Sequence, residues 1–145
     1  MLIGGSFNKV DKKGRIFIPS RFKEDIGETI VLCTAVFGKK CLWGFSLSEF
    51  DKFTAKLNQL PYGKMQDMYR YLSDGSVFTE VDASGRVLIP AELREFAGIG
   101  EEVRIVGMKN NIEIWSSEVW KAEKESINPL DFANVVDELN FTLGD

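Results

Sequence analysis

Histidine is absent from this 145-residue chain, and cysteine occurs only twice, as Cys33 and Cys41. The absence of histidine removes the residue that most often serves as a catalytic base. Two cysteines without histidine cannot complete an ordinary zinc site. Glycine-rich phosphate-binding motifs are also missing, because the fragment at residues 98–100 is followed by two acidic residues. We therefore expect neither an enzyme nor a bound metal or cofactor.

Long apolar runs and export signals are missing as well. No apolar stretch approaches the roughly 20 residues that a membrane span needs. The first ten residues have no positively charged start followed by an apolar run. We therefore expect a cytoplasmic protein that makes no contact with a membrane. In that reducing compartment, Cys33 and Cys41 are expected to be buried thiols and not a disulfide.

The net charge of −4 and the pI of about 5.0 argue against nucleic-acid binding if they are taken alone. The charge is unevenly distributed, however. Residues 118–145 contain seven acidic and two basic side chains. Residues 9–23 contain one acid and six basic side chains: Lys9, Lys12, Lys13, Arg15, Arg21 and Lys23. This asymmetry is compatible with scattered surface charge or with a polyanion-binding end opposite an acidic end.

The most informative feature of the sequence is an internal repeat. Residues 10–24 align without gaps on residues 81–95, and seven of the fifteen positions are identical. Gly27 and Gly98 keep the same spacing of 71 residues. The chain therefore contains two copies of one module.

The residues of each copy predict the same order of strands, turns and helices. An Asp-x-x-Gly-Arg turn follows a short strand; its aspartate caps its own backbone, and its glycine takes a positive φ. After the next strand, a proline starts a short helix and a glycine ends it. The last two strands of each copy are expected at Thr29–Thr34 and Cys41–Phe45, and at Val103–Met108 and Ile112–Trp115.

Neither module is large enough to bury a core alone. We therefore expect a mainly β fold with α-helices (α+β), built as one barrel with pseudo-twofold symmetry and peripheral helices. The expected units are the first copy with its following helix (7–57), a connecting helix (58–77), the second copy with its following helix (78–127), and an acidic amphipathic C-terminal tail (128–145).

Apolar stripes at helical spacing occur after each copy. Phe50, Phe53, Leu57 and Leu60 form the first stripe, and Phe132, Val135, Val136 and Leu139 form the last. Core packing is the favoured use of such stripes. Contact between subunits is the alternative, and it suits the C-terminal stripe best.

The turn arginines Arg15 and Arg86 occupy equivalent positions in the two copies. A guanidinium at a turn can bond bidentately to phosphate oxygens or to the O6 and N7 atoms of guanine. Alternatively, each arginine braces its own turn by pairing with Asp11 or Asp82. The chemistry of the residues alone leaves both roles open.

The doubled motif, Asp11-Lys-Lys-Gly14-Arg15 with Asp82-Ala-Ser-Gly85-Arg86, resembles that of the MraZ family. The likeness covers about residues 1–127. It implies the AbrB-like (SpoVT/AbrB) fold, in which hairpins are swapped between the copies. It also implies a ring of subunits that regulates transcription by binding short repeated promoter boxes of the division and cell-wall gene cluster, which includes its own gene.

In this likeness Arg15 and Arg86 are the DNA-facing residues, supported by Asp11, Gly14, Asp82 and Gly85. Local charge adds Lys9, Lys12 and Lys13. The second turn has Ala83 and Ser84 where the first has two lysines, so it is expected to be less basic. The expected partners are double-stranded promoter DNA, in a nucleoid-associated protein, and further copies of this chain. The alternative is a protein-interaction module, antitoxin-like or a scaffold, that uses the same fold without binding DNA.

Overall fold

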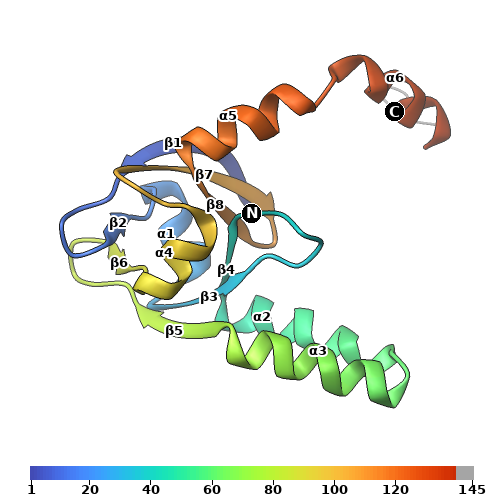
Figure 1. Cartoon of the computed structure of the whole chain (residues 1–145), viewed down its shortest axis with the longest axis horizontal. Helices are drawn as coiled ribbons and strands as arrows, with labels where there is room; N and C mark the ends of the chain where they lie inside the picture. The colour runs from blue at the N-terminus through green and yellow to red at the C-terminus, as the bar shows by residue number, and fades with distance from the viewer. Residues whose placement is uncertain (140–145) are drawn as a thin grey trace.

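The computed structural model of the chain describes residues 1–139 and shows an α+β fold with two antiparallel sheets (Figure 1). The first copy contributes β1 (Leu2–Lys9), β2 (Arg15–Phe17), the 3-10 turn η1 (Ser20–Phe22), α1 (Lys23–Ile26), β3 (Thr29–Thr34), β4 (Leu42–Ser46) and α2 (Leu47–Ala55). A connection formed by η2 (Lys56–Gln59) and α3 (Tyr62–Asp74) leads to the second copy. That copy contains β5 (Ser76–Glu80), β6 (Arg86–Leu88), α4 (Ala91–Ala97), β7 (Glu102–Lys109), β8 (Ile112–Ser116) and α5 (Ser117–Ser126). The chain continues through η3 (Pro129–Asp131) and α6 (Phe132–Glu138).

Strands are exchanged between the two copies. The larger sheet has the order β1-β7-β8-β4-β3-β5, so the first strand of each copy pairs with the third strand of the other. The small sheet joins β2 of the first copy to β6 of the second. This pairing confirms the expected duplicated fold with swapped hairpins. It also explains why neither copy can form its sheet alone.

The strand register follows a pseudo-twofold axis. In the small sheet Ile16 pairs with Val87, its own equivalent in the other copy. In the centre of the large sheet Trp43 pairs with Glu113, flanked by the pairs Leu42–Ile114 and Gly44–Ile112. A Cβ added at Gly44 would lie 2.9 Å from side-chain atoms of Ile112 and Ile30, so the absence of a side chain here permits the close central packing.

One core lies between the two sheets and the short helices. It takes apolar side chains from both copies: Leu2, Ile16, Ile18, Phe22, Ile26, Ile30, Leu32, Leu42, Val87, Ile89, Leu93, Ala97, Val103, Ile105, Ile112 and Ile114. Because β2 and β6 alternate inward and outward, Ile16 and Val87 are buried, whereas Phe17 and Leu88 are exposed on the other face. The core therefore fixes which face of the small sheet meets solvent.

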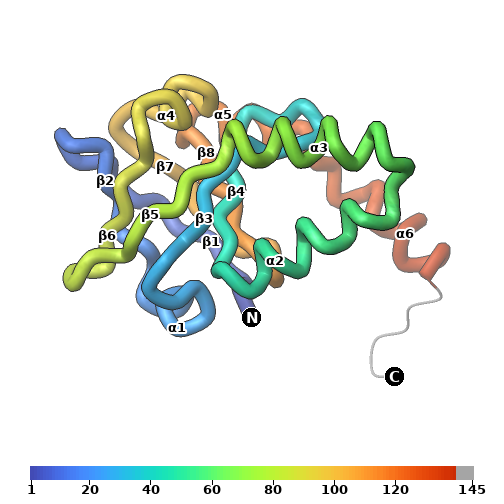
Figure 2. Tube along the Cα trace, turned by 90° about the horizontal axis from the view of Figure 1, so that it is seen from below, coloured from blue at the N-terminus to red at the C-terminus, as the bar shows by residue number. Residues whose placement is uncertain are grey.

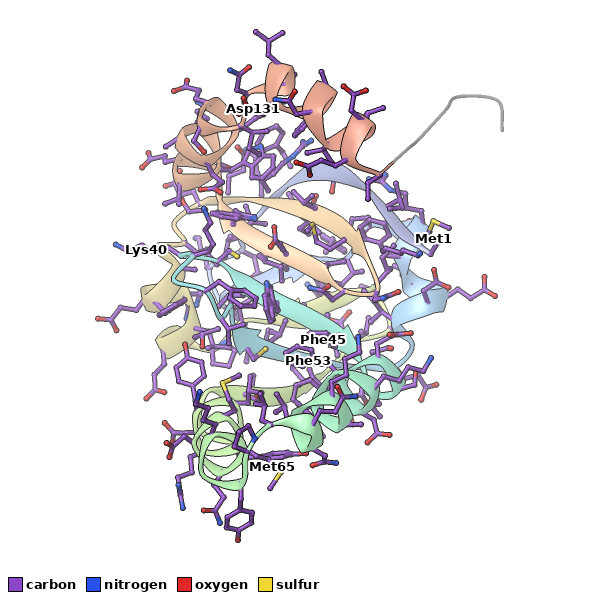
Figure 3. The ribbon with its side chains drawn as sticks, turned by 90° about the vertical axis from the view of Figure 1, so that its right-hand side faces the viewer. Met1, Lys40, Phe45, Phe53, Met65 and Asp131 are labelled. Carbon is purple, nitrogen blue, oxygen red and sulfur yellow. The ribbon has the colours of Figure 1, made fainter. Side chains whose placement is uncertain are left out.

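The predicted helical stripes have different outcomes. Ser46 Oγ accepts a hydrogen bond from Glu49 N at the start of α2, as the capping pattern predicts (3.2 Å). The ring of Phe53 in α2 stacks on the ring of Phe45 in β4, with 5.3 Å between the ring centres. Figure 3 shows the two residues side by side. The C-terminal stripe does not pack into the core, because Phe132 (52 % exposed) and Leu139 (71 % exposed) lie on the surface. The alternative use, contact between subunits, stays a prediction. Of the predicted tail 128–145, residues 140–145 lie outside the described part of the chain.

Cys33 and Cys41 are buried free thiols, as the sequence predicts. Burial raises the pKa of Cys33 to about 12 and also raises the pKa of Cys41. Both thiols therefore stay protonated and unreactive near neutral pH. Within residues 1–139, none of the helices combines the length and apolar character that crossing a membrane requires.

Candidate nucleic-acid interface

The two Asp-x-x-Gly-Arg turns have the same backbone structure. Gly14 and Gly85 both have φ of 86°, which other residues rarely adopt. Asp11 Oδ1 accepts hydrogen bonds from the backbone N–H groups of Lys13 and Arg15, both at 2.9 Å. The Asp82 carboxylate makes the equivalent bonds in the second turn. Each aspartate therefore folds its own turn, as the sequence predicts.

Each turn arginine also pairs with its aspartate. Arg15 Nε donates to Asp11 Oδ2 at 2.7 Å, and Arg86 Nε donates to Asp82 Oδ2 at 3.0 Å. Hydrogen bonds from the arginine backbone, and then from the arginine side chains, hold the pKa of both carboxyls below its ordinary value. The contact by which each arginine braces its own turn therefore exists in both copies. It uses Nε alone, and within residues 1–139 no hydrogen bond engages the terminal nitrogens of either guanidinium.

The small sheet brings the two arginines together. In the antiparallel register of β2 and β6, Arg15 faces Leu88 and Phe17 faces Arg86. Arg15 and Arg86 are thus diagonal neighbours on the outward face, a relation that places residues about 7–8 Å apart in such ladders. The Arg86 guanidinium lies 5.9 Å from the centre of the Phe17 ring. We call this outward face of Arg15, Phe17, Arg86 and Leu88 the ribbon face.

The ribbon face lies at one end of the molecule, away from α6, as Figures 1 and 2 show. A shallow depression beside it is lined by residues of β1, the first turn and the small sheet, including Lys9, Arg15 and Arg86. Lys12 and Lys13 are exposed at the tip of the first turn. The structure therefore gathers all five sequence-predicted basic residues around one face or its adjoining turn.

Each turn is also covered by a basic side chain from the other copy. A Cβ placed on Gly14 would lie 2.7 Å from Cζ of Arg94, which α4 supplies and whose Nε donates to Ile89 O at 2.9 Å. A Cβ on Gly85 would overlap the ammonium end of Lys23 from α1. Lys23 and Arg94 are equivalent, and neither is among the site residues predicted from the sequence. Their spacing of 71 residues was the available signal.

The positive charge around each turn includes side chains from the other copy. The second turn lacks the paired lysines of the first, and the sequence therefore indicates a weaker positive charge there. The exchange of helices between the copies returns one ammonium group to that turn. The charge near the first turn is reduced at the same time, because Glu101 and Glu102 share a surface depression with Lys9 and Lys12. Arg94 adds one positive charge to the first turn in the same way, so the exchange raises both turns equally and only the two glutamates reduce the difference between them.

Comparison with known proteins adds to this geometry. The profile of the MraZ protein family, described as antitoxin-like, matches residues 1–67 and 72–140. A protein of Caldicellulosiruptor bescii named transcriptional regulator MraZ is 43 % identical over 88 % of this chain and 90 % of its own length. Proteins with the same name from Caldicellulosiruptor saccharolyticus and Finegoldia magna are 40 % and 36 % identical, over 96 % and 97 % of this chain and 99 % of their own lengths.

These matches span both copies and the connection between them. They include both of the Asp-x-x-Gly-Arg turns. The chain therefore belongs to the MraZ family.

Proposed function

We propose that this protein is a transcriptional regulator that binds double-stranded promoter DNA through the ribbon face and its two turns. One observation carries the proposal: the fold places the two motif arginines on the same exposed face, each with its terminal nitrogens unengaged. The names of the curated relatives support the regulatory role. Proteins of this kind are expected in the cytoplasm, associated with the nucleoid.

The shape of the ribbon face fits a DNA groove. The major groove admits a two-stranded β-ribbon, and β2 with β6 is such a ribbon. Arginine is the most common reader of guanine, through its O6 and N7 atoms, and it also binds phosphate oxygens. Because Asp11 and Asp82 hold Nε of Arg15 and Arg86, both guanidinium groups are oriented before DNA arrives. Such preorganisation lowers the entropy lost on binding.

The overall negative charge does not oppose this proposal. Lys12, Lys13 and Lys23 are exposed near the two turns, whereas the exposed acids of α6 lie at the other end of the molecule. Encounter with DNA depends on the local field around the ribbon face more than on the net charge. The lysines would contribute affinity for any DNA sequence through release of counterions.

A ring of subunits completes the proposal. One ribbon face is short and can engage few phosphates, whereas linked copies raise the overall affinity by roughly 10²–10⁴ when their geometry matches the DNA. The target would then be short repeated boxes in the promoter of a division and cell-wall gene cluster that includes this protein's own gene.

The proposal is tested by fluorescence anisotropy with labelled DNA from upstream of the protein's own gene, against shuffled DNA of the same length. Wild type should prefer the native DNA, and Arg15→Ala/Arg86→Ala should remove that preference. The matched control is Arg70→Ala, because Arg70 also pairs with an aspartate, Asp67, but lies on α3 away from the ribbon. Equal binding of both DNAs by wild type, or unchanged binding by the double variant, would refute it.

The protein-interaction alternative keeps one observation in its favour, the antitoxin-like description of the family. It predicts a stoichiometric complex with a different protein and no preference for promoter DNA. A pull-down followed by the same anisotropy measurement on the complex separates the two functions.

A further inference from the structure

The helices that follow the last strand of each copy behave differently. In the first copy, α2 and η2 are followed by α3, which turns back to form a hairpin (Figure 1). Tyr69 Oη of α3 donates to Thr54 O of α2 at 3.1 Å. Leu57 and Leu72 of this hairpin are 7 % and 2 % exposed. The hairpin therefore covers part of the apolar surface of the first copy's helices, although Leu60 remains 38 % exposed.

In the second copy the hairpin does not form. Ile127 and Leu130, which occupy the positions equivalent to Leu57 and Leu60, are 45 % and 81 % exposed. Asn128 Oδ1 accepts a hydrogen bond from Leu130 N at 3.0 Å, and Pro129 starts η3, so the break after α5 is itself ordered. Beyond this break α6 continues away from the sheets, and Figure 3 shows Asp131 at the far edge of the molecule. Every residue from 124 to 139 is exposed.

A cleft lies between helix α5 and the strands β1 and β7. It has a volume of about 430 Å³ and is lined by Phe7, Arg104, Trp120, Lys121, Lys124 and Glu125. The Arg104 guanidinium lies 4.4 Å from the Phe7 ring centre and 6.0 Å from that of Trp120. Its Nε is buried without a hydrogen-bond partner. That atom is enclosed by its own chain, but Arg104 as a whole is partly exposed, so the rest of its guanidinium is the part that an acceptor from outside the chain can approach.

The equivalent position in the first copy contains no charge. Phe7 pairs with Arg104 across β1 and β7, and Phe78 pairs with Val31 across β5 and β3 in the same register. Val31 is fully buried. The second copy thus has a cation where the first has a core residue, and its cleft suits an acidic partner with an apolar face.

We infer that α6 from a second copy of this chain packs into this cleft. Helix α6 presents an apolar stripe of Phe132, Val135, Val136 and Leu139, all exposed. Residues 131–138 contain three acidic side chains, Asp131, Asp137 and Glu138, and no basic one. The apolar stripe is complementary to the rings of Phe7 and Trp120. The negative charge of the carboxylates is complementary to the positive charge of Arg104, Lys121 and Lys124. Among residues 1–139, none beyond Glu125 lines the cleft of its own chain.

This contact joins two different surfaces, so each copy donates α6 to one neighbour and accepts α6 from another. Such head-to-tail contacts close into a ring when the rotation between neighbours permits it. The inference rests on the self-assembly proposed above and names its interface; it is independent of DNA binding.

Sedimentation velocity on full-length chains without DNA tests the inference. The helix variant is Phe132→Glu/Val136→Glu, and the cleft variant is Lys121→Glu/Lys124→Glu. All four positions are exposed in the single chain, so circular dichroism should show normal folding. The matched control is Lys56→Glu/Lys64→Glu, which makes the same charge change as the cleft variant but on the first copy's helices.

Wild type and the control should sediment as the same assembly, and each variant alone should dissociate with a dissociation constant raised at least about tenfold. Mixing the two variants should give a 1:1 dimer, because the intact α6 of the cleft variant meets the intact cleft of the helix variant. Assembly of either variant at wild-type strength would overturn the inference while leaving self-assembly in place. Failure of the mixture to dimerise would overturn it as well. A monomeric wild type would remove both the inference and the proposed ring.

Discussion

Replacing Arg15 with alanine should separate DNA binding from folding. The side chain is 28 % exposed and makes one ion pair, from Nε to Asp11. Partly exposed pairs of this kind contribute little to the free energy of unfolding. The two backbone hydrogen bonds that Asp11 accepts do not involve the arginine side chain and remain in Arg15→Ala. The turn should therefore persist, and the melting temperature should fall by less than about 4 °C.

The same substitution should weaken DNA binding much more. If Arg15 contacts a base edge, its loss costs about 1–3 kcal/mol per site, which is about 5- to 150-fold in Kd. Contacts repeated in linked subunits multiply this loss. Arg86→Ala should have a similar effect, because Arg86 has the same ion pair and similar exposure, and Lys23 lies beside its turn.

Both quantities are measured on the same purified protein, the melting temperature by circular dichroism and Kd by anisotropy on promoter DNA. Arg70→Ala is the control, since it removes an equally simple Arg–Asp pair on α3. If Arg15→Ala melts more than about 4 °C lower but binds DNA normally per folded molecule, the arginine only braces its turn, and the assignment of the ribbon face is refuted. A variant that matches wild type in both measurements would exclude both roles.

Three further predictions concern charge, acid sensitivity and packing. Lys12→Ala, and separately Lys23→Ala, should weaken binding to all DNA sequences and reduce the slope of log K against log salt concentration by about one. The control Lys64→Ala, on α3, should leave this slope unchanged. DNA titrations at several salt concentrations measure the slope. Because folding holds the pKa of Asp11 and Asp82 below the unfolded value of 3.8, the stability they add should be complete above about pH 5 and lost as the pH falls through their folded-state pKa. The free energy of unfolding, measured with urea across this pH range, should depend less on pH for Asp11→Asn/Asp82→Asn than for wild type or the exposed control Asp67→Asn. An equal dependence would contradict the stabilising role given to the two carboxylates. Gly44→Ala should destabilise the fold by about 1–3 kcal/mol in urea, because its Cβ would press on Ile30 and Ile112; Gly63→Ala, where nothing lies within 4 Å of an added Cβ, should be neutral or stabilising.

The sequence predicted the local structure well because each copy carries short-range signals. Asp11 and Gly14 define a turn through their own backbone bonds, and that turn forms wherever the rest of the chain lies. The capping serine Ser46 and the helix-ending Gly98 act over three or four residues in the same way. Because the module is duplicated, each signal occurs twice, and the boundaries of the last two strands of each copy fell within a residue or two of the structure. The connecting helix, expected over 58–77, is shorter, since α3 spans Tyr62–Asp74 and follows the separate 3-10 turn η2.

The C-terminal stripe shows where such reasoning ends. Periodicity identifies an apolar face on a helix, but it does not say what covers that face. The equivalent helix α3 is held against α2 because the chain must return to β5, whereas α6 has no later strand to reach among the described residues. The same type of pattern therefore gave two helices packed against each other in one copy and an exposed helix in the other.

The sequence by itself determined the turns, the duplication and the positions of Arg15 and Arg86, because these depend on local backbone chemistry and on spacing along the chain. Only the tertiary structure decided that the two arginines share one face. That face arises from pairing β2 with β6, residues 71 apart in the chain, in a register imposed by burying Ile16 and Val87. Only the tertiary structure placed Lys23 and Arg94 over the opposite turns, because each helix packs against the other copy. Contacts between distant segments depend on the whole core, and local sequence signals do not encode them.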